Sequence, residues 1–265
     1  MLEIRKNHPP HHLHFPDAVW KDRAADVMAS LARRATGMTG ADIEQVVRHA
    51  RRRARGENRS ITYSDIDYVL RCARPPKSDA FSFRIANHEA AHAVVRIYLG
   101  VSSIDQITLN GTGGNAYVAG QYDVDETVTE ERIMAQIIVF LAGRAAEQEL
   151  CGGISAHSGG GEKSDLAQAT RLAYAIEMTT GLGRYHPLVY RDAKDPFTVL
   201  ADNPPLVELV DQRLAASYEA ARKLVVRHQK AIEYLAGCLL IWETLDGELL
   251  ERALANVRII LEESS

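Results

Sequence analysis

The chain has 265 residues, of which 46% are hydrophobic, 25% are charged and 6% are aromatic, and its formal net charge is −4. This length allows one large domain or two smaller ones, and the modest glycine and proline content favours a mostly helical protein. No apolar run approaches the ~18 residues that a membrane-spanning helix needs, which argues against a transmembrane segment in this chain.

The charges are distributed unevenly. Residues 1–80 carry 15 Lys and Arg against 10 Asp and Glu, whereas the remainder carries 16 against 25. This asymmetry suggests two units with different roles. The three cysteines are too far apart in the sequence for a metal-binding pair or a disulfide framework, so we expect a reducing compartment.

The N-terminal part predicts an extended segment and then short helices. Residues 1–16 are rich in histidine, but their prolines exclude a helix that would align the histidines around a metal. A capping box between Thr39 and Asp42 predicts the start of one helix. Helices are expected over residues 17–35, 40–56 and 62–73, and a linker is expected at 75–78.

An arginine cluster ends the second of these helices, at Arg51, Arg52, Arg53 and Arg55. Such a cluster can bind nucleic acid, but cations also suit the C-terminal end of a helix dipole. We therefore expect a solvated helix end and no nucleic-acid partner.

The sequence His88-Glu89-Ala90-Ala91-His92 lies in a stretch that predicts an apolar helix ending near residue 100. Residues four apart on a helix share a face, so His88 and His92 can reach one metal ion, and Glu89 can reach a water on it. Two imidazole ligands and a carboxylate base form the arrangement of zinc proteases. The alternative is a helix with two satisfied histidines, but the apolar flanks indicate burial, where imidazoles need partners such as a metal.

A hairpin is expected next, because residues 103–109 and 115–121 alternate in polarity and glycines stand between them. The second strand is the predicted substrate site, since an exposed strand edge pairs with extended peptide backbone whatever its side chains. The residues assigned to it are Asn115, Ala116, Tyr117, Val118, Ala119 and Gly120.

A long helix is expected over residues 128–150, and its small residues at 142–146 permit close helix packing. A glycine-rich loop and a helix capped by Ser164 follow. The loop is not a phosphate-binding loop, because Glu162 stands where glycine is required. Taken by itself, Asp165 is a first-turn acid that complements the helix dipole. A loop at 184–205 and helices at 206–227, 229–243 and 246–256 complete the chain.

Two resemblances extend this interpretation. The segment ATGMTGADIEQVVRHARRRA…ITYSDIDYVL resembles the small helical lid that ends an AAA+ ATPase module, although no nucleotide-binding core precedes it here. The motifs HEAAHAVV, LAGRAAEQEL and SDLAQATRLAYAIEMTTGLG, in this order, resemble the FtsH family of ATP-dependent zinc proteases. The likeness extends to the C-terminal helices and covers about residues 17–256.

The FtsH resemblance implies that His88, His92 and Asp165 hold one zinc ion per chain and that Glu89 is the general base. Glu147 is a rival third ligand, because other zinc proteases take a glutamate from a second helix. It is otherwise expected to orient a histidine or to lie on the helix surface. Ala91 stands where the family usually has glycine.

We therefore predict a mainly α fold: a lid-like three-helix unit with an extended N-terminal segment over residues 1–76, and an FtsH-like zinc peptidase domain with a small β-hairpin over 77–265. The predicted function is a zinc-dependent endopeptidase of unfolded proteins, normally coupled to an AAA+ ATPase module that is not in this chain. The alternative is a catalytically silent, regulatory or scaffold subunit of an ATPase–protease assembly, which the intact His-Glu-x-x-His motif argues against.

The resemblance also predicts the setting in which the domain works. It implies a homo-oligomer in the form of a hexameric ring, with unfolded proteins or peptides as substrates. We expect a cytoplasmic location, at the membrane surface if the chain is part of a longer, anchored protein.

Overall fold

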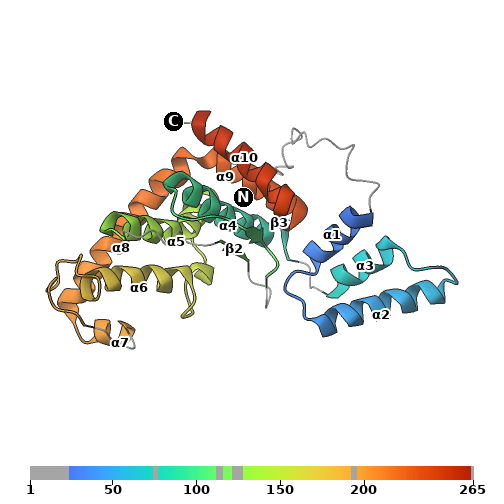
Figure 1. The fold of residues 1–265 in the computed structure, drawn as a ribbon, viewed down its shortest axis with the longest axis horizontal. Coiled ribbons are helices and arrows are strands. Elements are labelled where there is room, and N and C mark those ends of the chain that lie inside the picture. The colour runs from blue at the N-terminus through green and yellow to red at the C-terminus, as the bar shows by residue number, and fades with distance from the viewer. Residues whose placement is uncertain (1–23, 74–76, 112–115, 121–127, 192–195, 264–265) are drawn as a thin grey trace, which may run out of the picture.

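The structure is a computed structural model that describes residues 24–73, 77–111, 116–120, 128–191 and 196–263 (Figure 1). It is mainly helical with one small antiparallel sheet, as predicted. Within these ranges, no helix is both long enough and apolar enough to cross a membrane.

The first three helices form a group at one end of the molecule (Figure 1). In the predicted capping box, the Thr39 N–H donates to the Asp42 carboxylate at 2.9 Å, and the Thr39 hydroxyl accepts from the Asp42 N–H at 3.3 Å. Leu31, Val46 and Leu70 form an apolar cluster that belongs to this group alone. The helices are α1 (Ala24–Arg34), α2 (Gly40–Gly56) and α3 (Tyr63–Ala73), and residues 17–23 of the first predicted helix lie outside the described ranges.

The remaining helices surround a second, larger hydrophobic core. Helix α4 packs against α5 and α9, and α5 also packs against α6 and α8. Helix α4 ends where Gly100 adopts a left-handed conformation, with φ of 61°. The bounds are α4 (Asp79–Leu99), α5 (Glu130–Leu150), α6 (Asp165–Met178), α7 (Pro196–Ala201), α8 (Pro204–Arg227), α9 (Gln229–Trp242) and α10 (Gly247–Glu263).

Helix α10 continues seven residues beyond the predicted end at residue 256, and two further elements differ from the prediction in kind. Helix α7 lies within the segment expected to be a loop because of its prolines, but Pro196 opens the helix, where a missing N–H costs nothing. The predicted hairpin is present as β1 (Gln106–Thr108) and β2 (Tyr117–Ala119), but β3 (Thr244–Asp246) pairs with the other side of β1. Three residues between two helices are too few to show an alternating pattern, so the sequence predicted no strand there. The order β2-β1-β3 leaves β2 at an edge of this sheet.

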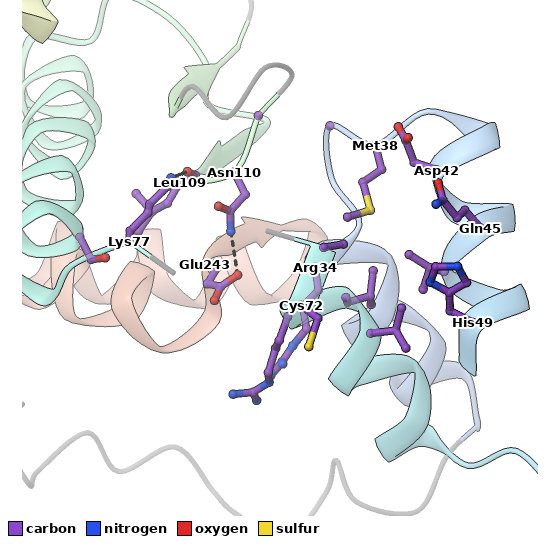
Figure 2. Close-up of a pocket in the computed structure, with 18 of the residues that line it drawn as sticks. Arg34, Met38, Asp42, Gln45, His49, Cys72, Lys77, Leu109, Asn110 and Glu243 are labelled. Carbon is purple, nitrogen blue, oxygen red and sulfur yellow. Dashed lines mark hydrogen bonds between the residues drawn. The ribbon is translucent and has the colours of Figure 1, made fainter. Parts of the chain in front are cut away.

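A cavity of about 990 Å³ separates the N-terminal helices from β1 and the end of α9 (Figure 2). Asp42 and His49 line it on one side, and Leu109, Asn110 and Glu243 line it on the other. The Asn110 amide donates to the Glu243 carboxylate at 2.7 Å. None of the residues of the His-Glu-x-x-His motif borders this cavity, so the predicted chemistry lies elsewhere.

Candidate metal centre

Three predicted ligands converge from two helices. His88 and His92 lie on one buried face of α4, each 6% exposed, and Asp165 opens α6. The Oδ2 atom of Asp165 is 3.2 Å from Nε2 of His88 and 3.4 Å from Nε2 of His92. One donor atom from each residue lies within 4.8 Å of the other two. The structure therefore gathers the donors that the motif and the resemblance assigned to one ion.

The second ring nitrogen of each histidine, Nδ1, also has a hydrogen-bond partner. Nδ1 of His92 lies 2.7 Å from the Val139 carbonyl oxygen, and Nδ1 of His88 lies 2.8 Å from Oε1 of Glu147. A carbonyl oxygen can only accept, so Nδ1 of His92 carries a hydrogen, and Nε2 is the ring nitrogen that faces Asp165. Metal-binding histidines characteristically have such a partner behind the ring. Glu147 thus lies behind the ring of His88, on the side away from the shared donors.

Helix α5 reaches the histidines along a single face. Val139, Gly143 and Glu147 are four residues apart, so they share one side of this helix. A Cβ atom at Gly143 would lie 2.3 Å from Nε2 of His88, which is closer than any side chain tolerates. Glycine therefore allows α5 to approach the imidazole. The sequence showed only a run of small residues here, and neither Val139 nor Gly143 was assigned to the site.

The charges in the cluster suit a bound cation. Burial alone would lower the pKa of His88, but hydrogen bonds with Asp165 and Glu147 outweigh it and raise this pKa to about 10. Burial would raise the pKa of both carboxyls, yet the histidines hold that of Asp165 well below its usual range, and bonds from His88 and Ser155 lower that of Glu147 to about 2. Without a metal, a proton on His88 thus balances two carboxylates. A divalent cation at the same place supplies that positive charge, and imidazole nitrogens with one carboxylate oxygen fit zinc.

The proposed base, Glu89, is buried beside the cluster. Burial raises its pKa, whereas attraction from His88 and His92 acts in the opposite direction. A carboxylate with a raised pKa is a stronger proton acceptor near neutral pH than an ordinary glutamate. The environment of Glu89 is therefore compatible with general-base chemistry.

The predicted substrate strand is described in part. Asn115 lies outside the described residues, Ala116 and Gly120 flank β2, and β2 itself contains Tyr117, Val118 and Ala119. The strand packs against α4, the helix that carries both histidines. The Tyr117 hydroxyl donates to Gln106 of β1 at 2.7 Å. An edge strand thus lies beside the helix that carries both histidines.

Comparisons with known proteins agree with this geometry. The chain is 28% identical over 264 residues to the ATP-dependent zinc metalloprotease FtsH of Chloroflexus aggregans, which covers 90% of the chain and 40% of that protein. It is 32% identical to FtsH 1 of Sorangium cellulosum, covering 85% of the chain and 39% of the relative. For the metalloprotease YME1L of Drosophila melanogaster, the identity is 31%, with 88% and 33% covered. The chain thus spans 40% or less of the length of these relatives.

The family comparison covers the whole candidate centre. The sequence model of Peptidase family M41 matches residues 78–253. This range includes the three donor residues as well as Glu89 and Glu147. The match extends from the start of α4 into α10 and is well over half of the chain. The chain therefore belongs to peptidase family M41.

Proposed function

We propose that this chain is a zinc-dependent endopeptidase in which His88, His92 and Asp165 hold one zinc ion. The convergence of these three donors, with both histidines held from behind, is the observation that carries the proposal. Three protein ligands leave a fourth position for water, which is the pattern of catalytic zinc sites. The relatives whose names include zinc metalloprotease support the choice of metal.

Each side chain has a defined task in peptide hydrolysis. A bound zinc ion lowers the pKa of a coordinated water toward ~7 and polarises the peptide carbonyl. Glu89 accepts the proton of the attacking water and delivers it to the leaving amine. Glu147 holds the ring of His88 through Nδ1, which would leave Nε2 directed at a bound ion. The edge of β2 pairs with the backbone of an extended substrate, which suits unfolded proteins of many sequences.

We further propose the division of the chain that the sequence predicted. Residues 1–76 form the lid-like unit, which the separate apolar cluster of α1–α3 supports, and residues 77–265 form the peptidase domain. In the complete protein, we expect an AAA+ ATPase module to deliver substrate to a homo-oligomeric, ring-shaped assembly. The location would be cytoplasmic, at the membrane surface if the complete protein is anchored.

The substitution Glu89→Gln tests the chemistry. It keeps the size of the side chain but removes the proton acceptor, so the variant should retain about one zinc per chain and lose about 10²–10⁴-fold in casein hydrolysis. The matched control is Glu131→Gln, at an exposed glutamate of α5, which should leave hydrolysis unchanged. Activity of Glu89→Gln near the wild-type rate would refute the assignment of the base. Wild-type protein with bound zinc and no hydrolysis would favour the silent or scaffold subunit.

The proposed setting has its own test. Because no phosphate-binding loop occurs in the sequence, the purified chain should cleave casein slowly whether or not ATP is added, and it should leave a stable folded protein intact. Light scattering at several protein concentrations measures self-association. A strict monomer would argue against the assembly, and ATP-stimulated degradation of the folded protein would argue against a separate motor.

A further inference from the structure

Arg84 connects α4 to the back of the candidate metal centre. It lies four residues before His88, one helical turn away on the same face. Its Nη1 atom donates to Oε2 of Glu147 at 3.1 Å and to the Gly153 carbonyl oxygen, and its Nη2 atom donates to the Cys151 carbonyl oxygen at 3.3 Å. One guanidinium thus binds both the carboxylate behind His88 and the segment that follows α5.

The two oxygens of the Glu147 carboxylate have separate partners. Oε1 accepts from His88, while Oε2 accepts from Arg84 and, at 2.7 Å, from the backbone N–H of Ser155. The Glu147 side chain is 1% exposed, so it depends on these partners for its charge and its orientation. Arg84 supports this carboxylate in two ways. It donates to Oε2 directly, and it also holds the Cys151–Gly153 segment that leads to Ser155.

We propose that Arg84 is a positioning residue of the metal centre, which fixes Glu147 so that His88 presents Nε2 to the ion together with Asp165. The inference rests on the proposed zinc site. The contacts form a register between the two helices: Arg84 and His88 contact Glu147, and His92 contacts Val139 one turn of α4 further on. Loss of the guanidinium leaves the buried carboxylate free to turn away from His88.

A matched arginine provides the control. Arg222 of α8 donates to Glu149, on the same helix as Glu147, at 2.6 Å. The side chain of Arg222 is 34% exposed and that of Arg84 is 28% exposed, so the two guanidinium groups are similarly accessible, whereas Glu149 is 21% exposed and Glu147 only 1%. Glu149 contacts neither histidine in the interactions of the described residues. The variants R84Q and R222Q therefore each break an arginine–glutamate pair on α5, but only R84Q disturbs the metal centre.

The experiment measures Zn²⁺ affinity by competition with a chromophoric chelator for wild-type protein, R84Q, R84K and R222Q. Thermal unfolding in EDTA reports the stability of the metal-free fold, and the visible absorption of the Co²⁺-loaded proteins reports ligand geometry. Loss of an outer partner of a ligand typically weakens metal binding about 10–100-fold, and we expect this for R84Q. R222Q should bind Zn²⁺ as wild type does. R84K should fall between wild type and R84Q, because an ammonium group reaches fewer partners than the guanidinium fork.

The outcomes separate this inference from the proposed function. Wild-type Zn²⁺ affinity in folded R84Q, or equal losses in R84Q and R222Q, would overturn the role of Arg84 and leave the zinc site intact. Wild-type protein that binds no Zn²⁺ would overturn both. If R84Q does not fold, R84K decides: weaker Zn²⁺ binding with an unchanged unfolding temperature in EDTA supports the inference, and wild-type affinity refutes it.

Discussion

Gly143 of α5 faces the imidazole of His88 on α4 without room for a side chain, since a Cβ there would lie 2.3 Å from Nε2 and 2.5 Å from Cδ2 of the ring. The same helix supplies the carbonyl of Val139 to His92 and the carboxylate of Glu147 to His88. Helix α5 therefore sets the position of both histidine rings, although it donates no proposed ligand itself.

The substitution Gly143→Ala should displace the His88 ring and weaken the metal site. Overpacking of this kind costs about 1–3 kcal/mol of folding stability, and we expect the zinc content to fall along with it. Gly56→Ala, at the end of α2 with open space around the new methyl group, is the control and should leave the zinc content unchanged. Metal analysis after gel filtration measures both variants. Full zinc content in Gly143→Ala would show that the ring can move without loss of the site.

The third ligand can be identified by comparing two carboxylate deletions. Asp165→Ala removes an oxygen that faces Nε2 of both histidines, so it should lower the zinc content more than Glu147→Ala, which removes a partner of Nδ1. Asp42→Ala removes the corresponding first-turn acid of α2 and controls for effects on helix initiation. Elemental analysis gives the zinc per chain. The opposite order would make Glu147 the ligand.

The substrate strand can be tested by changing the peptide rather than the protein. An antiparallel partner of the β2 edge would bond through alternate residues, so single N-methyl groups should weaken binding at every second position of a peptide. Affinity for the Glu89→Gln protein, which should bind peptide without cleaving it, is the measurement. Uniform effects at all positions would contradict recognition of the backbone by β2.

A buried histidine far along the chain predicts sensitivity to acid. His228 is 1% exposed, packs on the ring of Tyr98, and has no hydrogen-bond partner at either ring nitrogen among the described residues. Burial lowers its pKa, and the neighbouring Arg227 lowers it further. The unfolded chain therefore takes up a proton at a higher pH than the folded protein. Folding stability should fall as the pH drops below about 6.5, at up to about 1.4 kcal/mol per pH unit.

The variant His228→Phe keeps an aromatic ring against Tyr98 and removes the titrating group. Its free energy of unfolding should depend less on pH than that of the wild type between pH 7.5 and 5.5. Urea unfolding in EDTA measures this without a contribution from metal loading. Parallel pH profiles for the two proteins would show that His228 does not titrate differently in the folded and unfolded chains.

Local sequence determined much of this protein, because the physics involved acts over one or two helical turns. The spacing of His88 and His92 places both on one face of α4 wherever that helix packs. Thr39 and Ser164 cap α2 and α6 through side-chain bonds to nearby backbone N–H groups, which a short motif specifies. The hairpin could be predicted because two segments of alternating polarity lie on either side of a glycine-containing stretch. The family could be predicted because several short motifs occur in the order that is typical of it. Each of these motifs is short enough to be read from the local sequence.

The tertiary structure decided which distant groups meet the histidines. Asp165 could be read from the sequence alone only as a first-turn acid, and the resemblance was needed to assign it. For Glu147 the sequence left three roles open, a ligand, a residue that orients a histidine or a surface acid, and only the tertiary structure shows that its carboxylate lies at Nδ1 of His88. Gly143 and Arg84 carry no motif of their own, because their importance depends on the antiparallel register of α4 and α5. Strand β3 joins the sheet through pairing with β1, more than 130 residues earlier in the chain, and no local pattern encodes a contact of that range.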